Sequence, residues 1–273
     1  MTSSAEPDPT LPPPLPTSPE PGAPPLSDAA PETDALRLPT ASPIVTFSLI
    51  GLTLLIYLVQ RLTPDHQILY GYAYDLPAAW GAKFNDLIRA GQLWRFFTPM
   101  LLHGSAMHIG VNLYTIFSFG LGLERRFGHW RLALLCLLSG FAGNVLSFVI
   151  SPAPSVGSSA IVFGLIAAEG VFLYENRKLF GSETKLAITN VIVVITLYLA
   201  AGFSSPGYID NWEHVGGLLG GAIFTWFSGP LWTVEGKPPL EMLVDHRPAR
   251  DVVFGAGFTL LIFAILASVG MIL

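Results

Sequence analysis

The sequence NWEHVGGLLGGAIFTWF occupies residues 211–227 and carries much of the information about the architecture. It is apolar enough for a membrane helix, and small residues recur every four positions within Gly216–Gly221. Small residues at this spacing let two helix backbones approach closely in a bilayer. His214 lies near the start of the segment, and an ionisable side chain inside a membrane helix indicates a functional site by default. The segment therefore predicts a closely packed membrane helix that contributes to a site.

The composition of the whole chain also indicates a membrane protein. The 273 residues are 51% apolar and only 12% charged, with a mean hydropathy of +0.55. A soluble globular domain carries about 25% charged residues, which argues against a water-soluble fold. The net charge of −5 gives no reason to expect a nucleic-acid partner. Cys136 is the single cysteine, so an internal disulfide or a cysteine zinc site is excluded.

Residues 1–42 differ in composition from the rest of the chain. They hold about half of the 23 prolines, and their acidic residues outnumber the single basic residue, Arg37. Such a segment buries too little apolar surface to offset the entropy of ordering, which predicts a disordered cytoplasmic tail. It matches neither a signal peptide nor a transit peptide. A docking site for a proline-binding module is the alternative interpretation.

Seven apolar segments are predicted to cross the membrane as helices, since one span needs about 20 residues. They are Pro43–Val59, Ala106–Leu123, Leu132–Ile150, Ser158–Tyr174, Leu186–Phe203, Trp212–Phe227 and Val252–Leu273. The first six belong to a predicted core domain, residues 43–228. A polar cytoplasmic linker, residues 229–250, precedes the seventh helix in residues 251–273. The predicted fold class is an all-α polytopic membrane protein.

Lysine and arginine residues between the spans predict the orientation. They occur after the second, fourth and sixth spans, whereas the loops after the third and fifth spans have none. This distribution predicts a cytoplasmic N-terminus and an outer C-terminus. The lack of a recognisable organelle signal favours the plasma membrane. The first loop is an exception to this distribution, because it carries Lys83, Arg89 and Arg95 on the predicted outer side. Its aromatic residues and an amphipathic run predict that it lies in the membrane interface.

Four polar residues fall at one depth in this topology. His108 and Asn112 lie in the second span, while Ser159 and His214 lie near the starts of the fourth and sixth. Ser159 and His214 are a candidate nucleophile and general base. His108 and Asn112 are four residues apart on one helix face, and both can donate to an oxyanion. No carboxylate is placed to orient His214, so the spacing predicts a dyad near the outer surface.

Residues near these four are predicted to support the site, and one of them is an alternative nucleophile. Phe163 is four residues after Ser159 and is predicted to pack against the imidazole of His214. Gly164 is predicted to face the glycine-rich helix, which would bring Ser159 within hydrogen-bond distance of His214. Ser158 is a competing nucleophile on spacing alone. His103 is predicted to bond to loop backbone and orient the adjacent turn.

Four motifs together resemble the rhomboid family of intramembrane serine proteases. They are Gly157-Ser158-Ser159-Ala160-Ile161-Val162-Phe163-Gly164, the histidine-glycine segment 211–221, the HxxxxHxxxN pattern of His103, His108 and Asn112, and Leu93-Trp94-Arg95-Phe96-Phe97-Thr98-Pro99. The resemblance covers residues 43–228. It implies a rhomboid-like six-helix core, to which this chain adds a seventh C-terminal transmembrane helix.

The resemblance implies a role for each residue of the site. Ser159 would attack the scissile carbonyl, His214 would act as base and then acid, and the oxyanion would rest on Ser159 N–H, His108 and Asn112. Supporting positions are His103, Gly157, Phe163, Gly217, Gly221, Trp94 and Arg95. The implied substrates are single-pass transmembrane proteins cut near the outer face, without a metal or cofactor. Residues 202–211 would form a mobile cap and the fifth span a lateral gate; no oligomeric state is predicted.

Two acidic residues depart from what the resemblance leads us to expect. Glu213 stands where a small residue is expected, so it either faces the outer water or alters the base. Glu169 lies within the fourth span, about 15 Å of helix rise below Ser159. A carboxylate at that depth is protonated, faces a polar interior, or is paired, with Arg125, Arg126 or a backbone group as candidate partners.

Two other functions compete with proteolysis. The first is a catalytically silent rhomboid-like binder or chaperone of membrane segments, but Ser159 and His214 are both retained. The second is a transporter, which would be expected to show an internal repeat and polar residues across the whole membrane. The sequence shows no repeat, and its polar cluster stays on one side.

Overall fold

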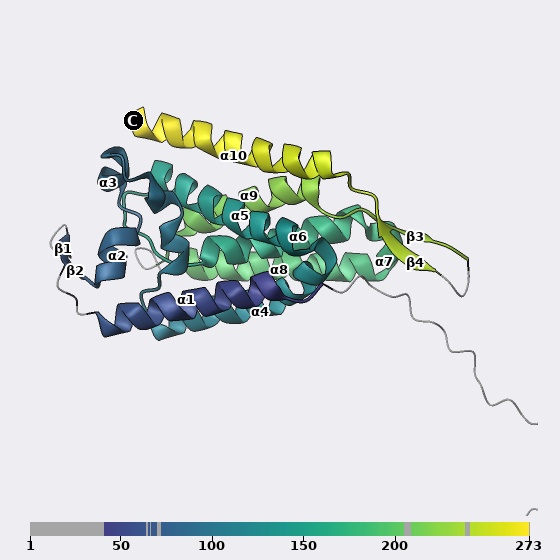
Figure 1. Cartoon of the computed structure of the whole chain (residues 1–273), viewed down its shortest axis with the longest axis horizontal. Coiled ribbons are helices and arrows are strands. Elements are labelled where there is room, and N and C mark those ends of the chain that lie inside the picture. Colours follow the sequence, from purple (N-terminus) through teal and green to yellow (C-terminus); the bar gives the residue numbers. More distant parts are fainter. Residues whose placement is uncertain are drawn as a thin grey trace, which may run out of the picture. The chain divides into compact units, whose positions relative to one another are not determined.

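The computed structural model describes residues 41–63, 65, 67–69, 72–204, 209–237 and 241–272. Nearly all of the predicted tail lies outside the described residues, as do positions 205–208 of the predicted cap. Residues 36–273 form one compact unit, and most of the described chain is helical (Figure 1).

Each of the seven predicted spans overlaps one long helix. These helices are α1 (Ile44–Leu62), α4 (Ala106–Phe127), α5 (His129–Ile150), α6 (Ser159–Glu175), α8 (Glu183–Phe203), α9 (Asn211–Ser228) and α10 (Ala249–Ile272). Among the described residues, α1, α4, α5, α8 and α10 are long and apolar enough to cross a membrane. α6 has only 17 residues, and α9 is rich in glycine. Both are surrounded by other helices, so much of their environment is protein rather than lipid. The predicted all-α polytopic fold is confirmed.

The short elements lie in the first loop, in the loop between α6 and α8, and in the predicted linker 229–250. They are the strands β1 (Gln67–Leu69), β2 (Tyr72–Tyr74), β3 (Trp232–Glu235) and β4 (Met242–Asp245), the helices α2 (Leu76–Gly81), α3 (Asn85–Arg89) and α7 (Arg177–Phe180), and the 3₁₀ helices η1 (Leu93–Phe96) and η2 (Thr98–Leu101). β1 pairs with β2, and β3 with β4, in two antiparallel hairpins. Three- or four-residue strands are too short for an alternating pattern to be recognised, which is why the sequence analysis missed them.

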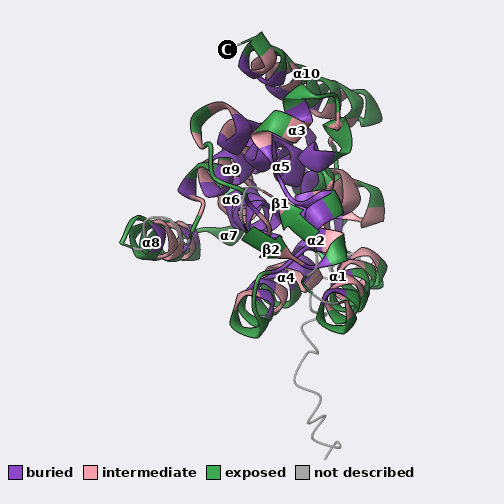
Figure 2. Ribbon diagram, turned by 90° about the vertical axis from the view of Figure 1, so that its left-hand side faces the viewer, coloured by how far each residue is buried: buried purple, intermediate pink, exposed green. Residues whose placement is uncertain are grey.

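Helices α5, α6 and α9 pack against one another at the centre of the bundle and are mostly buried (Figure 2). α4 and α8 pack on α6, α1 packs on α4, and α10 packs on α5 and α9. Glycine makes the central contacts possible, because a Cβ atom at Gly221 would lie only 2.5 Å from Gly164 Cα. Gly217 lies in the same way against the backbone of Ala160. The predicted close approach of these two helices is present.

The end of the bundle where α6 finishes, here called the Glu175 end, contains carboxylates with defined partners. Glu169 Oε1 accepts from Arg126 Nη1 at 2.9 Å, which decides between the two predicted arginines. Glu175 Oε1 accepts from Arg247 Nη2 at 2.8 Å. Glu124 is fully buried and accepts from the first backbone N–H groups of α1, at 2.7 and 2.8 Å. These pairs tie α1, α4, α6 and the segment before α10 together.

The first loop, between α1 and α4, is anchored by its basic residues. The buried Arg95 side chain donates to the carbonyl oxygens of Ala82 at 2.6 Å and Ala79 at 2.9 Å. Trp94 Nε1 donates to the carbonyl oxygen of Trp80 at 3.0 Å. Lys83 is also fully buried. Because Arg95 bonds to the loop's own backbone and Lys83 bonds to Ser147 of α5, both are weak indicators of membrane orientation.

Candidate functional site

Ser159 begins α6, directly after a turn that only glycine adopts easily. Gly157 has a φ of +145°, and its N–H donates to the carbonyl oxygen of Pro99 at 3.0 Å. A Cβ atom at Gly157 would lie 2.8 Å from His108 Nε2 and 3.7 Å from Ser159 Oγ. The space beside Gly157 is therefore bounded by an imidazole from α4 and the hydroxyl of Ser159. Ser159 and His214 are each only 8% exposed.

His214 is held by an aromatic contact. Its ring stacks on Phe163, with centroids 4.4 Å apart and planes inclined by 20°, and this is the contact that the four-residue spacing predicts. Within the described residues, Nδ1 of His214 is buried without a hydrogen-bond partner, so no carboxylate bonds to that nitrogen.

The predicted hydrogen bond between Ser159 and His214 is absent from the described residues. The Ser159 hydroxyl lies instead 3.5 Å from Glu213 Oε1. Helices α6 and α9 pack together as predicted. The Ser159 side chain, however, adopts a rotamer that directs its hydroxyl to Glu213 and not to His214. A side-chain rotamer of this kind cannot be inferred from spacing alone.

His103 organises the other half of the site. Its Nε2 lies 3.1 Å from Asn112 Nδ2, 3.2 Å from Ser158 Oγ and 3.4 Å from Ser158 N. Burial, assisted by the neighbouring His108, lowers the pKa of His103 to about 3, so the ring is neutral. In the neutral ring, a free Nε2 lone pair can accept a hydrogen bond from one of these three donors. The Ser158 hydroxyl thus faces His103, and Ser158 remains separate from His214.

Glu213 is 1% exposed, so the alternative in which it faces the outer water is wrong. Its Oε2 accepts from Ser155 Oγ at 2.6 Å. Gly143 of α5 leaves room for it, because a Cβ atom there would lie 3.3 Å from Glu213 Cγ. The side chain is therefore enclosed between α5 and the start of α6.

Two further charged residues lie behind Glu213, and the sequence analysis assigned neither to the site. Asp210 caps α9 by accepting from Glu213 N at 3.2 Å. Lys83 Nζ lies 3.8 Å from Asp210 and donates to Ser147 Oγ at 2.6 Å. Burial lowers the pKa of Lys83 to about 8, although Asp210 and Glu213 both act in the opposite direction. The sequence did hold one indication of this role. Lys83 lies in a loop on the predicted outer side, where the positive-inside rule disfavours lysine.

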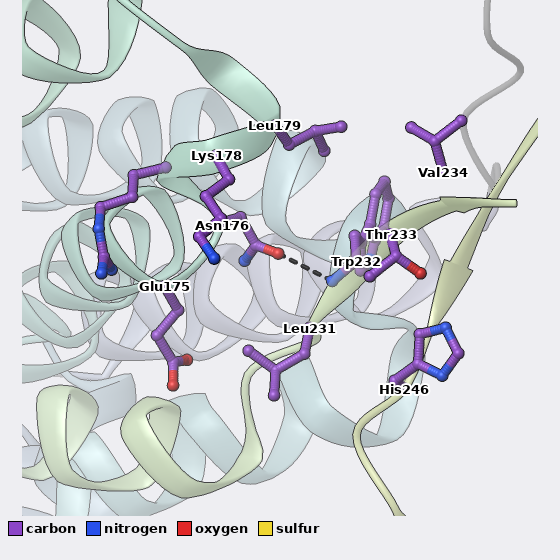
Figure 3. Close-up of a pocket in the computed structure, with 10 residues that line it drawn as sticks. Glu175, Asn176, Lys178, Leu179, Leu231, Trp232, Thr233, Val234 and His246 are labelled. Carbon is purple, nitrogen blue, oxygen red and sulfur yellow. Dashed lines mark hydrogen bonds between the residues drawn. The ribbon is translucent and has the colours of Figure 1, made fainter.

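Two cavities lie away from these residues. One, of about 580 Å³, is at the Glu175 end between α6, α7 and the β3–β4 hairpin (Figure 3). There Asn176 Oδ1 accepts from Trp232 N at 2.8 Å. The other, of about 520 Å³, lies between α4 and α8 and is lined by Ala106, Met107, Gly110, Val111, Tyr114 and Tyr198. Among the described residues, no group of three histidine, cysteine or acidic side chains is arranged to hold a metal ion.

Comparison with known proteins places the site within a recognised domain. A family model described as the Rhomboid domain matches residues 90–230. The chain is 41% identical over 143 residues to rhomboid protease GluP of Bacillus subtilis (strain 168), covering 52% of this chain and 27% of GluP. It is 30% identical over 197 residues to the chloroplastic RHOMBOID-like protein 9 of Arabidopsis thaliana, covering 71% of this chain and 45% of that protein. The chain thus spans less than half the length of both relatives.

Proposed function

The chain belongs to the rhomboid family, and we propose that it is an intramembrane serine protease with Ser159 as nucleophile and His214 as general base. The observation that carries this proposal is the geometry around Gly157, where Ser159 Oγ and His108 Nε2 border one space. His214 lies on the adjoining helix with its ring fixed by Phe163.

The proposed reaction requires proton transfer to and from His214 and stabilisation of a negatively charged carbonyl oxygen. Ser159 Oγ attacks the peptide carbonyl as its proton passes to His214, which requires the hydroxyl to rotate away from Glu213. The carbonyl oxygen becomes negative beside Ser159 N–H and His108, where donors aimed at the developing charge lower the barrier. Asn112 contributes its second amide N–H, because the first is directed to His103. His214 then returns the proton to the leaving amine as the C–N bond breaks, and a water molecule deprotonated by His214 hydrolyses the ester and restores the Ser159 hydroxyl.

The remaining assignments also belong to the proposal. Ser159 lies toward the outer face of a plasma membrane, with a cytoplasmic N-terminus and a cytoplasmic linker 229–250 in front of the seventh helix. The substrates are single-pass membrane proteins that enter between α4 and α8. The cavity between these helices and the high exposure of α8 (Figure 2) support this route.

The test compares wild type with Ser159→Ala, both purified in detergent and mixed with a generic single-pass membrane substrate. We expect cleavage by the wild type alone. Cleavage by both proteins would remove Ser159 from the reaction and direct attention to Ser158. Cleavage by neither would leave a silent binder or a selective protease, and a fluorophosphonate label on Ser159 separates these two.

A further inference from the structure

Glu213 and His214 are consecutive residues that both approach the start of α6. Neighbouring residues of a helix point about 100° apart, so they reach α6 at different places. Glu213 Oε1 lies 3.5 Å from Ser159 Oγ, whereas His214 stacks on Phe163, one turn further along. The Ser159 hydroxyl therefore lies within reach of a hydrogen-bond acceptor, Glu213, that is not its proposed base.

The Glu213 side chain is fixed firmly on the side away from Ser159. Ser155 Oγ donates to Oε2 at 2.6 Å, and the Asp210 cap fixes the backbone at Glu213 N. Lys83, which is fully buried, bonds to Ser147 and lies 3.8 Å from Asp210. With one oxygen and the backbone held, the other oxygen of Glu213 stays directed at Ser159.

From this geometry we propose that Glu213 is a positioning residue that holds the Ser159 hydroxyl away from His214 in the free enzyme. The inference rests on the proposed function of Ser159. The nucleophile forms only when the hydroxyl leaves the Glu213 oxygen and turns to the imidazole, so Glu213 competes with the base. A carboxyl oxygen and an amide oxygen both accept hydrogen bonds, and either can hold the hydroxyl.

The test measures the rate at which a small fluorophosphonate labels Ser159. In this reaction the bond between Ser159 Oγ and phosphorus forms, the phosphorus–fluorine bond breaks, fluoride leaves and the serine proton passes to His214. The probe is much smaller than a transmembrane substrate, so the rate reports on the hydroxyl rather than on substrate docking. Glu213→Met keeps an unbranched side chain of similar length without an oxygen, while Glu213→Gln keeps the oxygen.

We expect Glu213→Met to label up to about fivefold faster than wild type, the factor for an average hydrogen bond, since the competing contact is long at 3.5 Å. Glu213→Gln should label within about twofold of wild type by the same argument. The matched control is Glu169→Gln, which changes a carboxyl at the other end of α6 and should leave the rate unchanged. A purely structural role cannot produce a faster rate in one variant and rescue in the other.

The outcomes separate this inference from the proposed function. If wild type is not labelled on Ser159, the proposed function fails. If wild type is labelled and folded Glu213→Met labels at the same rate or more slowly, the positioning role is wrong. Loss of the folded state in Glu213→Met, checked by a thermal scan, would also overturn it, because the carboxyl would then be a structural requirement.

Discussion

The two ends of α6 hold their acidic side chains in different ways. At the Glu175 end, Glu169 and Glu175 each accept from a guanidinium group, of Arg126 and Arg247 respectively. At the opposite end, here called the Ser159 end, Glu213 accepts from serine hydroxyls. Arginine provides a planar fork of donors that fixes a carboxylate, whereas a hydroxyl rotates about one bond.

The difference distinguishes an end that holds helices together from an end that is proposed to carry out the reaction. Paired carboxylates and guanidinium groups have little freedom, so the Glu169–Arg126 and Glu175–Arg247 pairs join α4, α6 and the segment before α10. At the Ser159 end, the described residues show no hydrogen bond between the serine hydroxyl and His214 of the adjoining helix. Under the proposed function, a small rotation there would turn the hydroxyl toward the imidazole, while at the Glu175 end a comparable rotation would break an ion pair.

The largest contrast between the ends should come from His214→Ala. Without the imidazole, no base takes the serine proton, and we expect cleavage to fall by about 10³-fold or more. Arg126→Gln, which removes a guanidinium at the Glu175 end, should retain cleavage. The initial rates of cleavage of a single-pass substrate in detergent measure both variants. Turnover of His214→Ala near the wild-type rate would exclude His214 as the base.

Removal of one oxyanion donor should have the next largest effect. His108→Ala or Asn112→Ala should slow cleavage by about 10²–10³-fold, the range measured for one such donor in other proteases. The loss should appear mainly in kcat, because the interaction strengthens only in the transition state. An unchanged kcat in either variant would exclude that residue from the oxyanion hole.

Gly217→Val tests whether the Ser159 end depends on close helix contact. A side chain at Gly217 would collide with the Ala160 backbone, so we expect a loss of about 1–3 kcal/mol of stability from overpacking together with slower cleavage. The matched control is Gly257→Val in α10, where a Cβ atom meets nothing within 4 Å. Equal thermal stability of the two variants would contradict the packing argument.

The last contrast is a dependence of stability on pH that belongs to the Ser159 end alone. The pKa of Lys83 is lowered to about 8 in the folded protein, below that of an unfolded lysine, so the unfolded chain binds more protons between about pH 8 and 10.4. The stability of wild type should therefore rise relative to Lys83→Met across this window, by up to about 3 kcal/mol. Arg126→Gln should keep the wild-type rise.

Denaturant titrations of detergent-solubilised protein at pH 7, 8, 9 and 10 measure this contrast. Arg126→Gln controls for the general cost of removing a partly buried cation from an ion pair. If wild type and Lys83→Met show the same change in unfolding free energy between pH 8 and 10, the buried environment assigned to Lys83 is wrong.

Some of the site could be predicted because it depends on helix periodicity. The spacing of His108 and Asn112, the contact of Phe163 with His214, and the facing glycines Gly164 and Gly221 all follow from 3.6 residues per turn. The pairing of Glu169 with Arg126 was predicted only as one of several alternatives. Arg125 and Arg126 are neighbours in sequence, and the rotation of α4 against α6 decides which one faces the acid.

The sequence by itself determined the membrane fold, the helices and the residues available for the site, because hydrophobicity and periodicity are local properties. The tertiary structure decided that Lys83 enters the core beside Ser147, 64 positions along the chain, and that Glu213 turns inward. It also decided that the Ser159 hydroxyl faces Glu213 rather than His214. These three features depend on how distant segments pack and on side-chain rotamers. Packing of this kind and rotamers produce no periodic pattern in the sequence.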